Sequence, residues 1–152
     1  LAYLLEGVMS VANIRPYNAR FLLADKEISG EFILAAISNT TSLGGVLRLN
    51  DRLVSLNDGK LEVLLIRAPS SLAQLNTIIG ELLSQQFSGK DVLLLQAKQI
   101  TVFTEEDLDW TLDGECFSAE KMVEIENIPD AIELIVPPNK IVKENNTSVI
   151  EN

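Results

Sequence analysis

Residues 18–38 have the sequence NARFLLADKEISGEFILAAIS, and this stretch decides the fold class. Two runs rich in apolar residues, Asn18–Ala24 and Glu31–Ser38, flank the polar residues Asp25–Gly30. A polar connection of this length between two apolar runs is typical of a β-hairpin. We therefore expect the two runs to pair as antiparallel strands.

Short strand patterns and one helix pattern fill most of the remaining chain. Pro69, Ser70 and Ser71 offer a helix start, and apolar residues at helical spacing follow within about residues 70–87. These apolar residues are Leu72, Leu75, Ile78, Ile79, Leu82 and Leu83. The further strand patterns cover residues 61–68, 91–96, 99–104, 108–112, 122–125 and 131–136. Many short strands with one inserted helix predict a mainly β fold, a β-sandwich of short antiparallel strands.

The two ends of the chain lack the strand patterns of the middle. Residues 1–9 have apolar residues at helical spacing, and Pro16 would end this N-terminal helix. No helix cap precedes it, so we expect the chain to be a piece of a longer protein. We assign residues 1–138 to one β-sandwich domain and residues 139–152 to a tail or docking segment.

The composition restricts the chemistry. The chain of 152 residues has a net charge of -10, which disfavours a nucleic-acid partner because phosphate binding needs a basic surface. It contains no histidine, so acid–base chemistry would rest on carboxylates, lysines or tyrosines. The single cysteine, Cys116, is compatible with a cytoplasmic location, and we expect it to be a small packed hydrophobic residue.

Acidic residues are concentrated late in the chain. Residues 105–133 contain eleven acids and one base, Lys121. One interpretation is a set of solvated hairpin faces, and the other is a carboxylate-lined site for a metal or a hydroxyl substrate. The first needs no further assumption, and we favour it.

Glu115 is the main candidate for catalysis. It follows an Asp-Gly turn in the sequence Leu112-Asp113-Gly114-Glu115, and strands on both sides of such a turn can hold a carboxylate firmly. Partial burial near Trp110 or Phe117 would raise the pKa of the carboxyl group and suit it to act as a general base. The alternative is an ordinary hairpin with Glu115 exposed, which the spacing alone favours.

A second Asp-Gly turn suggests a metal site. Ser55, Asp58 and the backbone around Lys60 bring one carboxylate together with hydroxyl and carbonyl oxygens, which are the ligands of a hard cation such as Mg²⁺. A turn in which the Asp58 side chain bonds its own backbone is the simpler alternative.

The order of these pieces resembles the C-terminal domain of the bacterial diacylglycerol kinase-like lipid kinases, in the diacylglycerol kinase and NAD kinase-like superfamily. The matching features cover about residues 1–138. They are the N-terminal helix leading to Arg15-Pro16-Tyr17, the Ser38-Asn39 loop with Gly44-Gly45, the Asn57–Val63 turn and strand, the Asp113-Gly114-Glu115 motif, and residues 131–137.

The resemblance implies a second domain of an ATP-dependent lipid kinase. The general base would be Glu115, and a Mg²⁺ site would fall on Ser55, Asp58 and the carbonyl of Lys60. The nucleotide-binding domain that holds most of the ATP lies outside this sequence, so we expect the chain alone to be inactive. The implied partners are a lipid alcohol such as diacylglycerol and the inner face of the membrane, which the protein would contact peripherally. A homodimer is one of the assembly states that the sequence leaves open.

Two other functions stay open on the residues alone. A non-catalytic β-sandwich that binds a ligand or a protein would use the acidic stretch only as a soluble surface. A glycosidase with Asp113 and Glu115 as its two acids is a weaker alternative, because the chain has only 5% aromatic residues to line a sugar cleft.

Overall fold

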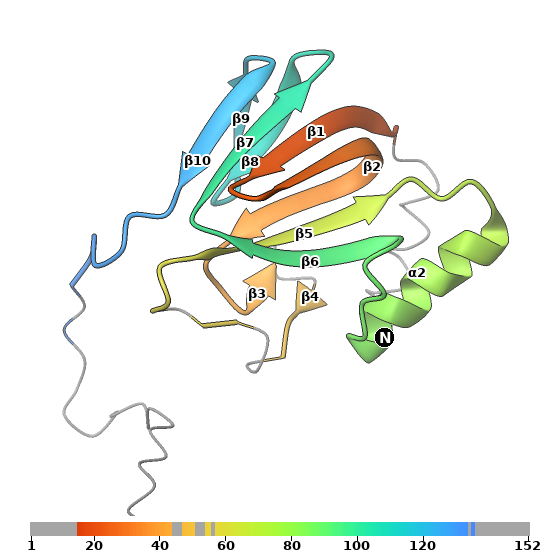
Figure 1. Ribbon diagram of the computed structural model, residues 1–152, viewed down its shortest axis with the longest axis horizontal. Coiled ribbons are helices and arrows are strands. Elements are labelled where there is room, and N and C mark those ends of the chain that lie inside the picture. Colours follow the sequence, from red (N-terminus) through yellow and green to blue (C-terminus); the bar gives the residue numbers. More distant parts are fainter. Residues whose placement is uncertain (1–14, 44–46, 51–53, 56, 134, 136–152) are drawn as a thin grey trace, which may run out of the picture.

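The computed structural model describes residues 15–43, 47–50, 54–55, 57–133 and 135. Figure 1 shows its strands and its helix in chain order, coloured from red to blue. The strands are β1 (Tyr17–Leu23), β2 (Lys26–Ser38), β3 (Ser42–Leu43), β4 (Leu47–Arg48), β5 (Leu61–Arg67), β6 (Val92–Ala97), β7 (Gln99–Thr104), β8 (Leu108–Leu112), β9 (Glu115–Ala119) and β10 (Met122–Glu126), and the helix is α2 (Leu72–Ser84). The predicted mainly β fold is confirmed.

A six-stranded antiparallel sheet organises the described part of the chain. Its strand order is β10-β7-β1-β2-β5-β6. Two small two-stranded sheets, β3-β4 and β8-β9, accompany it. The large sheet is strongly curved, so that β5 and β6 run below the strands β1, β7 and β10 in Figure 1.

The first hairpin confirms the predicted pairing and corrects its turn. β1 and β2 pair antiparallel, with Leu23 opposite Lys26, so the turn consists of Ala24 and Asp25 instead of residues 25–30. The strand extends through the polar segment because Ile28, which is 5% exposed, belongs to the core. Residues 27–30 therefore alternate between exposed and more buried positions, with the period of two that a strand requires.

The sheet buries apolar side chains on both faces. The larger cluster combines residues from β1, β2, β5, β6 and β7, and in it the rings of Phe21 and Phe32 meet edge to face with centroids 5.2 Å apart. The second cluster lies where α2 covers β5 and β6, and it includes Leu64, Ile66 and Ile78. Because both faces are covered, β5 contains five consecutive buried residues, Glu62–Ile66.

Helix α2 begins where the sequence predicts. Ser71 is the N-cap, and its hydroxyl accepts a hydrogen bond from the backbone N–H of Gln74 at 3.2 Å. The helix ends at Gln85, which adopts the left-handed conformation with φ of 54°. The apolar stripe is narrower than predicted, because Leu72 and Leu83 are 80% and 55% exposed. Ile78 and Leu82 are the helix residues that pack on the second cluster.

The last predicted strand is wrong. Residues 131–133 and 135, which the structure describes, have no strand conformation, although the pattern predicts a strand over residues 131–136. The N-terminal helix, the Gly44-Gly45 pair and the tail from residue 139 lie outside the described residues. None of the described helices is long and apolar enough to cross a membrane.

Candidate functional site

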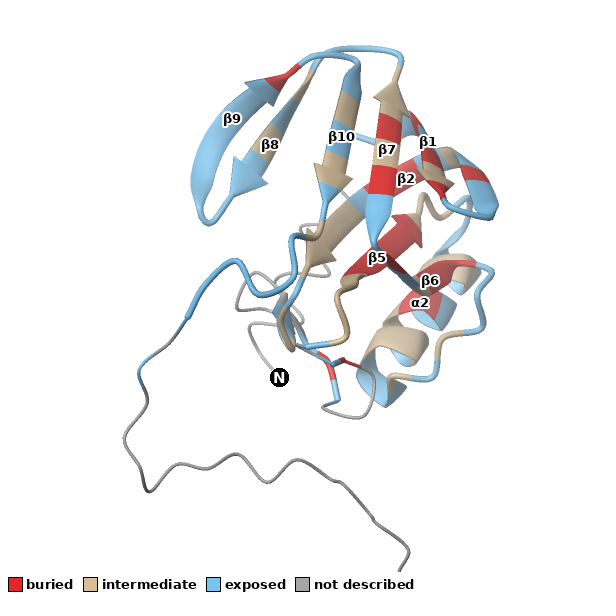
Figure 2. Cartoon of the chain, turned by 60° about the vertical axis from the view of Figure 1, so that its left-hand side comes forward, coloured by how far each residue is buried: buried red, intermediate tan, exposed pale blue. Residues whose placement is uncertain are grey.

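The β8-β9 hairpin carries Glu115 and is inserted between two paired strands. β7 pairs with β10 directly, and Thr104 donates its backbone N–H to the carbonyl of Lys121 at 2.9 Å. This bond closes the base of the hairpin, which then extends away from the sheet (Figure 2). The hairpin is thus anchored at one end and free at the tip.

The tip is a two-residue turn of the kind predicted. Asp113 and Gly114 both have positive φ, 49° and 93°, as a type I′ turn requires. Leu112 and Glu115 face each other directly across this turn. Glu115 is therefore held at the first position of β9 by the geometry of the turn.

The two faces of the hairpin differ in chemistry. Trp110 packs against the larger core cluster, and Phe117 lies opposite it on β9. Since strand residues two apart share a face, Glu115 lies on the same side of the hairpin as Trp110 and Phe117. The other face is polar, and there the hydroxyl of Ser118 donates a hydrogen bond to Asp109 at 2.7 Å.

Glu115 itself is exposed, together with its apolar neighbours at the tip. Leu112 is 56% exposed and Phe117 is 51% exposed. Within the described residues Glu115 is therefore exposed, as in the ordinary hairpin that the spacing alone favours, and the alternative of partial burial near Trp110 or Phe117 is not found. The arrangement presents one carboxylate between two exposed apolar side chains, a combination suited to a substrate that has a hydroxyl next to a hydrocarbon part.

The surrounding acids are solvated. All eleven acids between residues 105 and 133 are exposed, which agrees with the interpretation as hairpin faces. Within the described residues no group of three or more acids or cysteines is arranged to hold a metal ion. Cys116 is also exposed, so the expectation of a packed cysteine is wrong, because residue 116 lies on the polar face of the hairpin.

The second Asp-Gly turn lies at the start of β5. The side chain of Asp58 accepts a hydrogen bond from the backbone N–H of Lys60 at 3.0 Å, and Gly59 has a φ of 69°. This is an Asx-type turn, in which the aspartate side chain bonds the backbone two residues on, and it is the simpler alternative to a metal site. Ser55 is exposed, and among the described contacts no hydrogen bond joins it to Asp58 or Lys60.

Asn127 fixes this turn from a distant part of the chain. Its side-chain amide donates a hydrogen bond to the carbonyl of Lys60 at 3.0 Å, and its backbone N–H donates to the carbonyl of Lys98 at 2.9 Å. A carbonyl oxygen has two lone pairs, so the carbonyl of Lys60 still has capacity for a cation. The sequence offered no sign of this contact, because residues 60 and 127 are far apart in the chain.

A buried acid lies next to the same turn. Glu62 is 0% exposed, and its Oε2 is buried without a hydrogen-bond partner. Glu62 follows Lys60 by two residues, and a buried carboxylate oxygen without a partner is compatible with a hard cation nearby. The residues present therefore fit the Mg²⁺ implied by the resemblance, with Asp58 as the one charged ligand.

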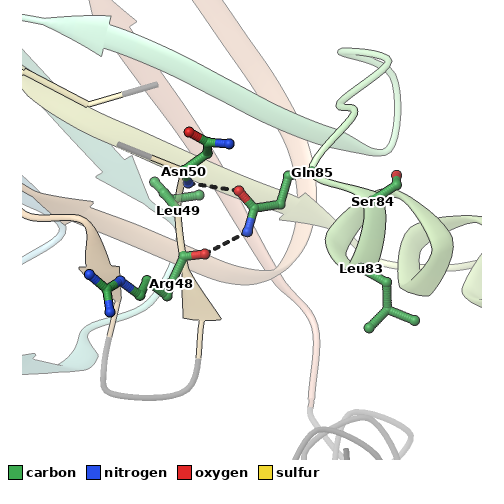
Figure 3. A pocket seen from close by; sticks show the side chains of 6 residues that line it. All are labelled: Arg48, Leu49, Asn50, Leu83, Ser84 and Gln85. Atoms are coloured by element: carbon green, nitrogen blue, oxygen red, sulfur yellow. Dashed lines mark hydrogen bonds between the residues drawn. The ribbon is translucent and has the colours of Figure 1, made fainter. Parts of the chain in front are cut away.

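A shallow pocket of about 420 Å³ lies elsewhere, at the end of α2 (Figure 3). Gln85 donates a hydrogen bond to the carbonyl of Arg48 at 2.6 Å and accepts one from the backbone N–H of Asn50 at 2.7 Å. The side chain of Gln85 thus ties the end of the helix to residues 48–50. None of the predicted site residues lines this pocket, and we regard it as a structural junction.

Fold and site together define a class of protein, a β-sandwich-like domain that presents the carboxylate of Glu115 near the tip of a β-hairpin. Over residues 1–136 the sequence matches the family described as the YegS C-terminal NAD kinase beta sandwich-like domain. The chain belongs to this family, and the resemblance found in the sequence is confirmed.

Two relatives illustrate the family. A "Probable lipid kinase YegS-like" protein from Chromohalobacter salexigens is 35% identical over 117 residues, which cover 76% of this chain and 37% of that protein. A diacylglycerol kinase from Bacillus subtilis is 24% identical over 140 residues, or 92% of this chain and 46% of that protein. The chain therefore spans less than half the length of these relatives.

Solved structures share the fold. A crystal structure of a diacylglycerol kinase from Bacillus anthracis superposes with a TM-score of 0.54 at 18% identity, over 79% of this chain and 43% of that one. A second structure from the same organism gives a TM-score of 0.63 at 21% identity, over 82% and 40%. At these identities the likeness supports the fold alone.

Proposed function

We propose that the chain is the second domain of an ATP-dependent lipid kinase that phosphorylates a hydroxyl group of diacylglycerol or a similar lipid. The observation that carries the proposal is the placement of Glu115 directly after a type I′ turn, on the apolar face of the hairpin and between Leu112 and Phe117. The names of the relatives from Chromohalobacter salexigens and Bacillus subtilis support the substrate class.

In this proposal Glu115 acts as the general base. Its carboxylate accepts the proton of the lipid hydroxyl while the hydroxyl oxygen attacks the γ-phosphorus of ATP. The new bond joins that oxygen to phosphorus, the bond between the γ-phosphorus and the bridging oxygen breaks, and ADP leaves with the electron pair. ATP binds mainly to a nucleotide-binding domain outside this chain, so the hairpin supplies the base and part of the acceptor pocket.

The proposal gives the remaining predicted residues a supporting role. Ser55, Asp58 and the carbonyl of Lys60 would hold Mg²⁺, which would supply positive charge at the start of β5 when bound. Asn127 and the Asp58 side chain keep the turn in shape through their own hydrogen bonds. Peripheral contact with the inner face of the membrane follows from the proposed substrate, because diacylglycerol resides in bilayers.

The test compares variants of the full-length protein that contains this chain. ATP-dependent phosphate transfer to diacylglycerol in mixed micelles is measured for the unchanged protein, for Glu115→Gln and for Glu124→Gln. Glu124 is an exposed acid on the neighbouring strand β10 and serves as the matched control. We expect Glu115→Gln to lower kcat by a factor of about 10²–10⁴ with unchanged folding, and Glu124→Gln to leave it unchanged.

The opposite results have clear meanings. If Glu115→Gln transfers phosphate as fast as the unchanged protein, Glu115 is not the base. If the unchanged protein transfers phosphate to no lipid alcohol, the kinase proposal fails, and a non-catalytic β-sandwich that binds a ligand or a protein takes its place.

A further inference from the structure

Glu62 is a buried acid on a strand whose other buried residues are apolar. It lies on β5, on the same face as Leu64 and Ile66 of the second core cluster, and it is completely buried. Its Oε1 accepts a hydrogen bond from Gln96 at 3.3 Å, whereas its Oε2 has no partner. Neither of the two ion pairs found among the described residues includes Glu62. A buried carboxylate in this state needs a nearby donor or cation to compensate it.

A second orphaned oxygen lies next to it. Ser38 on β2 is the direct partner of Glu62 across the sheet, and Gln96 on β6 is its partner on the other side. The hydroxyl oxygen of Ser38 is buried and has no hydrogen-bond partner. Two neighbouring strands thus present two buried oxygens without partners on one face of the sheet.

The pair is close to the Asp58 turn. Glu62 follows Lys60 by two residues, and a strand rises by about 3.3 Å per residue, so the two α-carbons are about 7 Å apart. Glu62 is therefore close along the chain to the turn whose carboxylate and carbonyl oxygens fit a hard cation.

We infer that Glu62 is a buried counter-charge for a divalent cation at the Asp58 turn, with Ser38 as the adjoining hydroxyl. This inference rests on the Mg²⁺ site of the proposed function and adds two residues to it. Glu62 raises the affinity of the site in two ways. Its negative charge acts through a poorly screened interior, and its free oxygen accepts a hydrogen bond from the water that Mg²⁺ retains in proteins. Glu62 is a positioning residue and not a direct ligand.

Removing the charge of Glu62 tests the inference. Mg²⁺ binding to the full-length protein is measured by isothermal titration calorimetry, and thermal unfolding is measured in EDTA and in MgCl₂. We expect Glu62→Gln to lower the Mg²⁺ affinity by about 10- to 100-fold, the usual loss for a residue that supports metal ligands. In EDTA the same variant should unfold at an equal or higher temperature, because it removes an uncompensated buried carboxylate and its amide can donate to Ser38.

Two further variants make the comparison specific. Glu62→Asp keeps the charge and should keep most of the Mg²⁺ affinity. Glu81→Gln is the matched control, since Glu81 on α2 also has a buried carboxylate oxygen without a partner, and it should leave the affinity unchanged. If Glu62→Gln does not fold, Glu62→Met, which fills the same volume without a polar group, replaces it in the comparison.

Each outcome decides between the two proposals. If the unchanged protein binds Mg²⁺, Asp58→Asn abolishes binding and Glu62→Gln does not weaken it, the metal site holds and the role of Glu62 is overturned. If the unchanged protein binds no Mg²⁺, the metal site and the role of Glu62 both fail, whereas the role of Glu115 is judged separately by phosphate transfer. A Glu62→Gln variant that loses stability in EDTA and keeps its Mg²⁺ affinity would show a purely structural carboxylate.

Discussion

The side-chain amide of Asn127 donates a hydrogen bond to the backbone carbonyl of Lys60 across 67 residues of sequence, at 3.0 Å. The segment that follows β10 is thereby attached to the turn that precedes β5. The backbone bond from Asn127 to Lys98 fixes the same residue to the turn between β6 and β7. One asparagine therefore joins three parts of the chain that are remote in sequence.

Asn127→Ala should lower the free energy of unfolding. The substitution removes a partly buried hydrogen bond and leaves the carbonyl of Lys60 without this donor, for a loss of about 1–2 kcal/mol. Urea denaturation measures the change. Asn76→Ala is the control, because Asn76 is exposed in α2 and alanine favours the helix there. An equal loss in both variants would argue against the structural role of Asn127.

Gly30→Ala and Gly80→Ala should change stability in opposite directions. Gly30 has a φ of 149°, and a β-carbon there would press against the guanidinium of Arg67. That guanidinium bonds the carbonyl of Ser29 at 3.1 Å, so we expect a loss of about 1–3 kcal/mol. Gly80 lies in α2 with open space around it, and alanine should stabilise the protein by up to about 1 kcal/mol. Urea midpoints measure both changes, and a stabilised Gly30→Ala variant would contradict the argument.

Gly114→Ala should loosen the β8-β9 hairpin before the rest of the protein. A φ of 93° costs an L-residue about 1–2 kcal/mol, and the hairpin has few other contacts to compensate. Trp110 is the only tryptophan in the chain, so its fluorescence reports on the hairpin and on its contact with the larger core cluster. In urea its transition should precede the circular dichroism transition of the sheet. Asp113→Asn is the control, since Asn-Gly suits the same turn, and coincident transitions in Gly114→Ala would refute the prediction.

The phenol of Tyr17 should make the free energy of unfolding fall at alkaline pH. Burial raises its pKa from 10.0 to about 12, against the opposing effect of a hydrogen bond with the backbone of Ala35. Between these two pH values the unfolded chain loses the phenolic proton and the folded protein keeps it. The contribution of Tyr17 to the free energy of unfolding is therefore fully present below pH 10.0. About 2–3 kcal/mol of it is lost as the pH rises from there through about 12.

The measurement compares the unchanged protein with Tyr17→Phe. Lysines also titrate in this range, so the difference between the two proteins isolates the phenol. Urea denaturation at about pH 9 and about pH 11 should show a steeper loss of stability in the unchanged protein. Parallel losses in both proteins would mean that Tyr17 does not titrate with a raised pKa.

Local sequence predicted most of the longer elements and the Asp-Gly turn of the candidate site. The Asp-Gly turn before Glu115 was predictable because two adjacent residues determine a type I′ turn. The Ser71 cap of α2 was predictable for a similar reason. The first hairpin turn was misplaced, because the polar residues 25–30 look like a loop until Ile28 is known to enter the core.

The remaining parts of the site depend on contacts between remote residues. Glu62 occupies a position in the sequence that suits a solvated strand residue, and it is buried only because β2, β5 and β6 lie side by side. Asn127 reaches Lys60 only once β10 has joined the opposite half of the sheet. Neither contact follows from spacing along the chain, since each depends on the strand order.

The hairpin also makes the position of Glu115 sensitive to small insertions and deletions. Ala119 is buried at the base of β9, four residues from Glu115, so both lie on the same face. If one residue is inserted between them and Ala119 keeps its place, Glu115 turns to the polar face of Asp109 and Ser118. Two inserted residues turn it back. An odd or even number of residues in one short strand therefore decides whether the carboxylate lies on the apolar or on the polar face of the hairpin.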